Sequence, residues 1–325
     1  MSLHIFFLAI WLASAPQSPS AVPPPPVEGF QQNFDAGRYA QARRELEAEI
    51  SRSPQNAHLH FWLARSAFEL SDFDAAARAA ERAAQLDPKN SEYQMWLGRA
   101  YGRKAEIESS FFLARKTRLA FEAAVRLDPA NIRARRDLAE FYIDAPWILG
   151  GSKDKARQQV EAIAQLDQAE GIMALADFLR MQEQPQKAGE QYARLLALKP
   201  RKMEAYYEAL NFYERQGEAA QMRRAIEAAE VVQSSAPPLL YFRAVARVIA
   251  GVQFDQAEKE LKTYIESAPN RSDLPGHGDA HHWLGKIHEQ LGDYTGAAEQ
   301  YRAALQIEPR SKRFREDLKR VEKKT

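Results

Sequence analysis

The sequence predicts an all-α protein, built as a solenoid of about eight helix-turn-helix repeats and closed by a C-terminal capping helix. Two observations carry this prediction. Short segments ending in Asp-Pro, Lys-Pro or Glu-Pro recur along the chain, and each follows an apolar stretch with helical spacing. Alanine is abundant and glycine is scarce, at 15 of 325 residues, which favours helices over sheets.

The N-terminal residues are expected to lie outside the solenoid. IFFLAIWLA, at residues 5–13, is an unbroken apolar run that is too short to span a bilayer but fits the core of a secretory signal peptide. We therefore expect residues 1–21 to be a signal peptide and the protein to be exported, as a periplasmic or secreted protein. A retained N-terminal membrane anchor is the alternative. The four prolines at 23–26 predict a stiff linker over residues 22–27.

Residues 28–311 are assigned to the repeats. Four markers each end a helical stretch, because proline cannot continue a helix: AAQLDPKN (83–90), AAVRLDPAN (123–131), LLALKPRK (195–202) and AALQIEPRS (303–311). Before a marker, an aromatic residue in a turn is followed by a small residue on a helix face, as with Phe73 and Ala76. The pattern places the repeat starts near residues 23, 57, 91, 132, 169, 203, 237 and 278.

The repeat pattern resembles the tetratricopeptide repeat family over almost the whole chain after residue 27. The helix-A signature of that family stands at Leu97 and Gly98, and its helix-B signature includes Tyr301 and Pro309. The resemblance implies a right-handed superhelix. It also implies a concave groove, lined mainly by the first helices of successive repeats, that holds a peptide or helix of a partner protein.

The end of the chain predicts a capping helix over residues 312–325. Phe314, Leu318 and Val321 fall on one helical stripe, which can cover the apolar face of the last repeat. The basic residues around this stripe are expected to face solvent.

Two turns are longer than the repeat pattern requires. Residues 144–155 (DAPWILGGSKDK) carry about five extra residues between the helices of the fourth repeat, with Ser152 placed to cap the second helix. Residues 102–116 carry about seven at the equivalent turn of the third repeat. Apolar residues from both segments are expected to meet on one edge, either as a small local core or as a partner-binding lip: Phe111, Phe112, Trp147, Ile148 and Leu149.

Candidate groove residues follow from the register of the repeats. The fifth residues of repeats two to eight are rich in aromatic residues and methionine: Phe61, Met95, Arg136, Met173, Tyr207, Tyr241 and His282. The ninth residues run Arg65, Arg99, Glu140, Asp177, Asn211, Val245 and Lys286. Adding Arg133, we expect a groove that grips an apolar or aromatic segment, with acidic residues favoured near the arginines. The alternative is that the fifth residues are ordinary core positions.

The sequence shows little that indicates catalysis. The chain has no cysteine, and Gly150-Gly151-Ser152 lacks the spacing of a phosphate-binding loop or a nucleophile elbow. Four of the seven histidines lie in GHGDAHHWLGKIHEQ (276–290), so a metal-dependent enzyme is the alternative function. Its zinc ligands would be drawn from His277, Asp279, His281 and His282.

The charge balance bears on the partner. With 45 Lys or Arg and 44 Asp or Glu, no net charge draws the chain to nucleic acid or anionic lipid. We therefore predict a non-enzymatic scaffold that needs no cofactor and binds a protein or peptide, with no membrane span beyond a possible N-terminal anchor.

Overall fold

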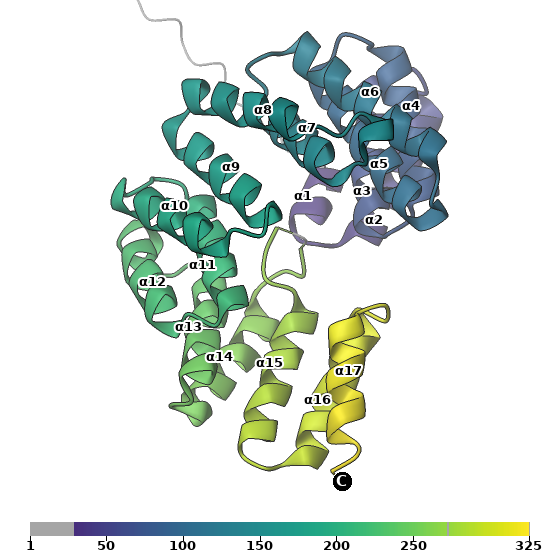
Figure 1. The fold of residues 1–325 in the computed structure, drawn as a ribbon. Coiled ribbons are helices and arrows are strands. Elements are labelled where there is room, and N and C mark those ends of the chain that lie inside the picture. The colour runs from purple at the N-terminus through teal and green to yellow at the C-terminus, as the bar shows by residue number, and fades with distance from the viewer. Residues whose placement is uncertain (1–28, 272, 325) are drawn as a thin grey trace, which may run out of the picture.

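The computed structural model describes residues 29–271 and 273–324, and every regular element within them is a helix. The helices form eight consecutive pairs followed by one last helix (Figure 1). The pairs are α1 (Gly29–Asp35) and α2 (Tyr39–Arg52), α3 (Ala57–Glu69) and α4 (Phe73–Leu86), α5 (Ser91–Glu108) and α6 (Phe111–Leu127), α7 (Ile132–Asp144) and α8 (Lys153–Leu166), α9 (Gln168–Met181) and α10 (Pro185–Ala197), α11 (Met203–Gln216) and α12 (Ala219–Gln233), α13 (Pro238–Ala250) and α14 (Phe254–Ser267), and α15 (His277–Gln290) and α16 (Tyr294–Ile307).

The last helix is α17 (Lys312–Val321), and a short 3-10 helix, η1 (Trp147–Leu149), lies between α7 and α8. This arrangement confirms the predicted all-α repeat fold. The proposed signal peptide or anchor at 1–21 and the proline-rich linker at 22–27 lie outside the described residues.

The turn between two repeats ends one helix and starts the next. Pro88 follows the end of α4, and Asn90 then caps α5 by accepting hydrogen bonds from the N–H groups of Glu92 and Tyr93. Asn131 caps α7 in the same way after the second Asp-Pro marker. The prolines of these markers end the preceding helices, and the asparagines fix where the following helices begin.

Apolar burial forms a row of clusters along the solenoid. The largest cluster runs from α9 to α15 and includes Tyr206 and Leu284, while another joins Phe30 of α1 to Leu46 and Leu59 in the next helices. A single helix pair cannot hide its apolar face, so each pair is stabilised by the surface it buries against its neighbours.

Small residues let the helices approach one another. A Cβ atom placed on Gly98 of α5 would lie 2.4 Å from a ring carbon of Phe121 in α6. Gly285 and Tyr301 repeat this geometry, also at 2.4 Å, in the last pair. Alanines on the second helices have no exposed surface: Ala42, Ala76, Ala156, Ala188, Ala257 and Ala297. Aromatic rings therefore occupy the space that larger side chains at these positions would fill.

The third pair differs from the expectation of a long turn. The extra residues at 102–116 lengthen the two helices, so that α5 has 18 residues and α6 has 17, while most other helices have 13 or 14. The turn itself is short, with Ser109 in the left-handed region and Ser110 as the cap of α6. The prediction of an expanded turn here is wrong, because the inserted residues continue both helical patterns.

The fourth pair keeps its expanded turn. Gly150 has a φ of +97°, and a Cβ on Gly151 would lie 1.7 Å from the carbonyl oxygen of Ala145, so neither position accepts another residue without rearrangement. Ser152 then accepts a hydrogen bond from the N–H of Lys155, as the predicted cap of α8.

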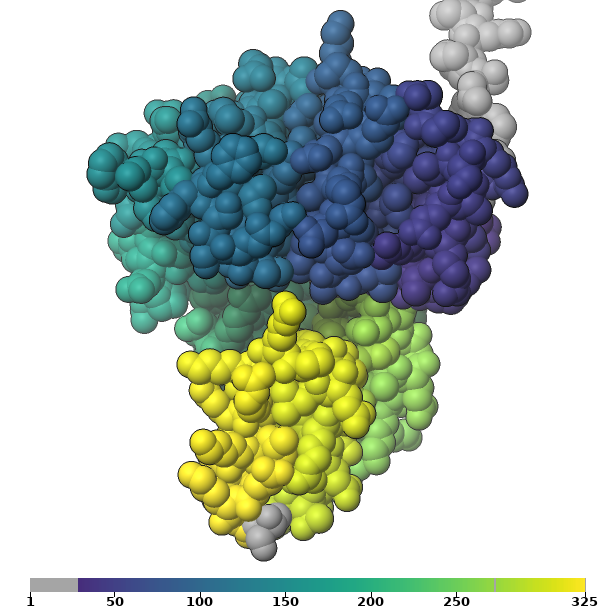
Figure 2. Space-filling model, turned by 90° about the vertical axis from the view of Figure 1, so that its right-hand side faces the viewer, coloured from purple at the N-terminus to yellow at the C-terminus, as the bar shows by residue number. Residues whose placement is uncertain are grey.

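The solenoid curves until its first pair reaches the connection between α14 and α15. Arg271 donates a hydrogen bond to the carbonyl oxygen of Asp35 at 3.1 Å, although 236 residues separate them. A Cβ on Gly37 would lie 2.9 Å from the carbonyl oxygen of Asn270. We call these four residues the closing contact. Figure 1 shows the α14–α15 connection beside α1, and Figure 2 shows the N-terminal repeats directly above the C-terminal ones.

The last helix covers the eighth pair. Phe314 and Val321 of α17 are completely buried, and the ring of Phe314 stacks on His282 of α15 with centroids 5.1 Å apart. The predicted stripe therefore seals the apolar end of the solenoid.

Candidate binding groove

Four of the ten predicted groove residues are buried in the packing between helices. Met95, Met173, Tyr241 and His282 are each at most 4% exposed. The expectation that these side chains face the groove is wrong, and the alternative assignment to core positions holds for them. The side chains at these four positions pack against neighbouring helices, as the contact between His282 and Phe314 illustrates.

The buried hydroxyl of Tyr241 has a hydrogen-bond partner within the protein. Its hydroxyl donates a hydrogen bond to Glu214 at 2.8 Å, and the indole N–H of Trp283 donates to the same carboxylate oxygen at 2.9 Å. Glu214 thereby links α11, α13 and α15. Burial raises the pKa of the Glu214 carboxyl, while the two hydrogen bonds act in the opposite direction.

The other six predicted residues keep part of their surface accessible. They belong to α3, α5, α7 and α11: Phe61, Arg65, Arg99, Arg133, Arg136 and Tyr207. The structure thus leaves the arginines on the open face and removes most of the apolar side chains from it.

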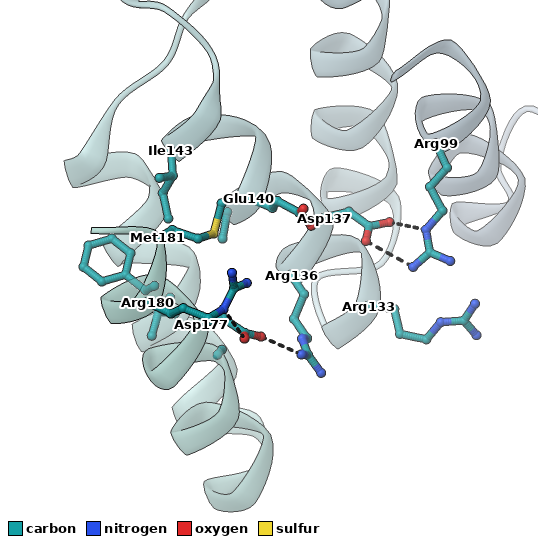
Figure 3. Close-up of a pocket in the computed structure, with 13 residues that line it drawn as sticks. Arg99, Arg133, Arg136, Asp137, Glu140, Ile143, Asp177, Arg180 and Met181 are labelled. Atoms are coloured by element: carbon teal, nitrogen blue, oxygen red, sulfur yellow. Dashed lines mark hydrogen bonds and ion pairs between the residues drawn. The ribbon is translucent and has the colours of Figure 1, made fainter. Parts of the chain in front are cut away.

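A pocket of about 270 Å³ lies between α5, α7 and α9 (Figure 3). On one side, Arg99 forms two hydrogen bonds with the carboxylate of Asp137, at 2.6 and 3.1 Å. Such a two-point pair fixes the plane of the guanidinium group. Arg99 is therefore held by the protein itself, which reduces its capacity to bind an acidic residue of a partner.

Arg136 lies at the centre of a second group of charges. It contacts Asp177 at 2.8 Å, Glu208 at 3.4 Å and Glu170 at 3.8 Å. Burial alone would lower the pKa of Arg136, but the neighbouring carboxylates, Asp177 first among them, raise it above its usual value. This arginine is also satisfied within the chain, so it connects α7 to α9 and α11.

Glu140 lines the same pocket and makes no ion pair among the described residues. Its pKa is raised by partial desolvation of the carboxylate at the pocket and by the nearby negative charges of Asp137 and Asp144. The pocket therefore presents a carboxylate in addition to its arginines.

Arg65 differs from the other arginines because it pairs with no carboxylate among the described residues. Its guanidinium lies 4.2–5.6 Å from the ring centroids of four aromatic residues: Phe34, Phe61, Trp62 and Trp96. Its Nε atom is buried without a hydrogen-bond partner in the described part of the chain. Burial, together with the positive charge of Arg133, lowers the pKa of Arg65 to about 10.

Arg133 is the most accessible of these arginines. Its only ion pair in the described chain is a long contact of 3.7 Å with Glu92, and its side chain is 55% exposed. It lines both the first pocket and an adjoining depression over α5, α7 and α11. Arg65 and Arg133 are thus the two cations of the groove that the chain does not neutralise closely.

The histidine-rich segment does not assemble a metal site in the described residues. His277 contacts the carbonyl oxygen of Ala268, His281 contacts Gln300, and His282 contacts Asp317. Within residues 29–271 and 273–324, no group of three or more His, Cys, Asp or Glu side chains converges on one point.

None of the helices in the described residues is both long enough and apolar enough to cross a membrane.

Comparison with known proteins supports the repeat architecture. A family model described as tetratricopeptide repeat matches residues 33–90, 63–106 and 252–312. No curated protein matches the sequence.

Three solved structures illustrate the similarity. Yeast Tom70 has a TM-score of 0.63 and 14% identity, over 91% of this chain and 60% of that chain. A monomeric mutant of IFIT1 with m7Gppp-AAAA has a TM-score of 0.53 and 17% identity, over 89% and 69%. A tetratricopeptide repeat protein from Parabacteroides merdae ATCC 43184 has a TM-score of 0.50 and 16% identity, over 90% and 95%. At these identities, the neighbours show the shared fold alone.

Proposed function

We propose that this chain, which belongs to the tetratricopeptide repeat family, is a non-enzymatic scaffold that holds a segment of a partner protein in the groove over α3, α5 and α7. An acidic side chain of that segment lies against Arg65 and Arg133. The observation that supports this best is Arg65 itself, a partly buried cation without a carboxylate partner among the described residues.

The electrostatics of the two arginines favour an anion. Burial first, and then the charge of Arg133, lowers the pKa of Arg65, while the more weakly acting carboxylates of Glu69, Asp35 and Glu92 raise it. The two cations therefore repel each other in the free protein. A carboxylate placed beside both would replace this repulsion with two attractions. A hydrogen bond to a charged group contributes about 1.5–3 kcal/mol, which corresponds to roughly 10- to 100-fold in affinity.

The surroundings of Arg65 suit a rigid contact. The four aromatic rings hold its guanidinium in place, so little side-chain freedom is lost when a partner binds. The indole N–H of Trp96 also has no hydrogen-bond partner among the described residues. Phe61 adds apolar surface next to the cation, and such combinations of arginine and aromatic residues often dominate binding energy.

The location of this function is a separate part of the proposal. The apolar run at residues 5–13 supports export, so we place the partner in the periplasm or outside the cell. Sequencing of the mature N-terminus tests this part independently of binding.

The binding proposal is tested with a displayed library of random peptides. Peptides selected on the wild-type protein should be enriched in Asp or Glu, and their affinity should fall as salt is added. Arg65→Ala and Arg133→Ala should each weaken a selected peptide by roughly tenfold or more. The matched control is Arg126→Ala, because Arg126 is an exposed arginine on α6, outside the groove.

Circular dichroism should show the same helix content for all three variants, since neither groove arginine stabilises a buried charge in the described chain. Selected peptides without acidic residues, or equal affinity for the Arg133→Ala variant, would contradict the proposal.

A further inference from the structure

The third and fourth pairs expose five large apolar side chains on one edge of the solenoid. Trp147 is 84% exposed, Ile148 71%, Phe111 70%, Phe112 68% and Ile107 53%. We call these residues the expanded edge, because they come from the lengthened helices α5 and α6 and from η1. The small local core expected from the sequence does not form, since four of the five residues are more than two-thirds exposed.

The expanded edge is continuous across the two pairs. Phe111 lines an apolar pocket of about 400 Å³ together with Pro146 and Leu149 from the turn that holds η1. A Cβ on Gly150 of that turn would lie 2.9 Å from the side chain of Arg118 in α6. The turn therefore rests against α6, and the residues of both segments form one surface. Exposed apolar surface of this kind marks a site of interaction.

The surroundings of the expanded edge are basic. Residues 102–118 and 144–157 contain eight Lys or Arg against four Asp or Glu, although the whole chain carries a net charge of only +1. Arg115 and Lys153 are exposed and form no ion pair within the described residues. Three of the eight cations pair with carboxylates outside these segments: Lys104 with Asp74, Lys116 with Glu81 and Arg118 with Glu122. The cations that stay unpaired in the described chain, Arg115 and Lys153 among them, favour an anionic partner.

The charge of the expanded edge distinguishes between three possible partners: a second copy of the chain, an acidic peptide and a lipid surface. A second copy of this chain docked edge to edge would place two basic surfaces against each other, which is unfavourable. An acidic peptide seated in the pocket would meet the carboxylates of Glu106 and Asp144, which line it. A lipid surface avoids both conflicts, because it attracts the edge through its overall charge and accepts protruding side chains without a matching shape.

The residue types agree with this choice. Tryptophan and phenylalanine insert readily at the boundary between lipid headgroups and acyl chains, and Lys or Arg beside them contact anionic headgroups. We propose that the expanded edge inserts Phe111, Phe112, Trp147 and Ile148 into the surface of an anionic lipid bilayer, and that the surrounding basic residues hold it there. This proposal is independent of the binding groove.

The test uses Trp147 as a local reporter in the full-length protein. Vesicles contain phosphatidylcholine with or without phosphatidylglycerol, and a second set carries brominated acyl chains, which quench tryptophan fluorescence on contact. The chain has five tryptophans, so a Trp147→Phe protein is measured in parallel and its signal subtracted. The difference reports on the expanded edge even when another part of the chain contacts the same vesicles.

We expect brominated anionic vesicles to quench Trp147, with little effect from neutral vesicles. The double substitution Phe111→Ser with Phe112→Ser lies in the first turn of α6, where serine is tolerated, and should weaken this quenching by about tenfold or more. The double substitution Arg115→Glu with Lys153→Glu should also weaken the quenching of Trp147 by about tenfold or more. The quenching that remains should depend less on salt concentration. Val231→Ser is the matched control, because Val231 is 87% exposed on α12, away from this edge.

Three results would overturn the proposal: Trp147 that stays unquenched by anionic vesicles, equal quenching by neutral vesicles, or unchanged quenching in the Phe111→Ser/Phe112→Ser protein. Sedimentation equilibrium adds a fourth. A dimer of the wild-type protein that dissociates in the same double variant would assign the edge to a second copy of the chain.

Discussion

Replacing Gly98 by alanine should destabilise the third pair of helices, although alanine is the better helix former. The added methyl group would lie 2.4 Å from a ring carbon of Phe121, whereas ordinary contacts begin at 3.4 Å. Phe121 is only 6% exposed, so its ring has little room to move. Overpacking of a core costs about 1–3 kcal/mol, and the gain in helix propensity offsets up to about 1 kcal/mol. We expect a net loss of about 1–2 kcal/mol.

Gly102 supplies the matched control on the same helix. A Cβ there would lie 3.4 Å from the side chain of Thr117, which is an acceptable contact, so Gly102→Ala should stabilise the protein by about 0.5–1 kcal/mol. Urea unfolding followed by circular dichroism gives both values under identical conditions. Equal stability of the two variants would refute the close approach of α5 and α6 as the reason for glycine at position 98.

Three further predictions concern polar contacts. Tyr241→Phe should lower the free energy of unfolding, measured with urea, by about 1–2 kcal/mol, because Glu214 loses a hydrogen-bond donor. Tyr207→Phe is its control and should change the free energy of unfolding by less than about 0.5 kcal/mol, since the Tyr207 hydroxyl makes no hydrogen bond within the described residues. The pKa of Glu214 is higher in the folded protein than its value of 4.5 in the unfolded chain, so protonated Glu214 stabilises the fold. This contribution is fully present below pH 4.5 and is lost as the pH rises through the folded pKa. Glu214→Gln should therefore flatten the pH dependence of the urea midpoint above pH 4.5. Ser152→Ala should destabilise the first turn of α8 by about 1 kcal/mol, because the N–H of Lys155 loses its hydrogen-bond acceptor. Amide hydrogen exchange in that turn should become faster, and unchanged exchange would contradict the capping role of Ser152.

Most of the fold could be predicted because its signals are local and repeated. An Asp-Pro marker ends a helix wherever it occurs, and a buried alanine such as Ala76 recurs at a fixed distance before it. The same reasoning could not show whether the insert at 102–116 would loop out, because helix continuation depends on what the longer helices contact.

The groove was harder to predict because neighbouring helices partly cover both sides of the first helix in a repeat. Residue spacing alone therefore does not separate accessible side chains from buried ones. A pattern of spacing places Tyr241 and Tyr207 at equivalent positions, yet Tyr241 is enclosed by Tyr264 and bonded to Glu214, while Tyr207 keeps accessible surface. The predicted arginines keep accessible surface, but the carboxylate partners of Arg99 and Arg136 come from other repeats. Asp177 neutralises Arg136 from 41 residues away, a pairing that one sequence does not reveal.

The closing contact changes how the solenoid comes apart. A row of stacked repeats usually frays, since a terminal pair has one neighbour and leaves without disturbing the rest. Here Arg271 holds the backbone of Asp35, so the opening helices cannot detach without also breaking a contact made from the seventh and eighth pairs. Local unfolding of the first pair of helices is therefore coupled to the connection between α14 and α15, so fraying at this end costs more free energy than it would in an open solenoid.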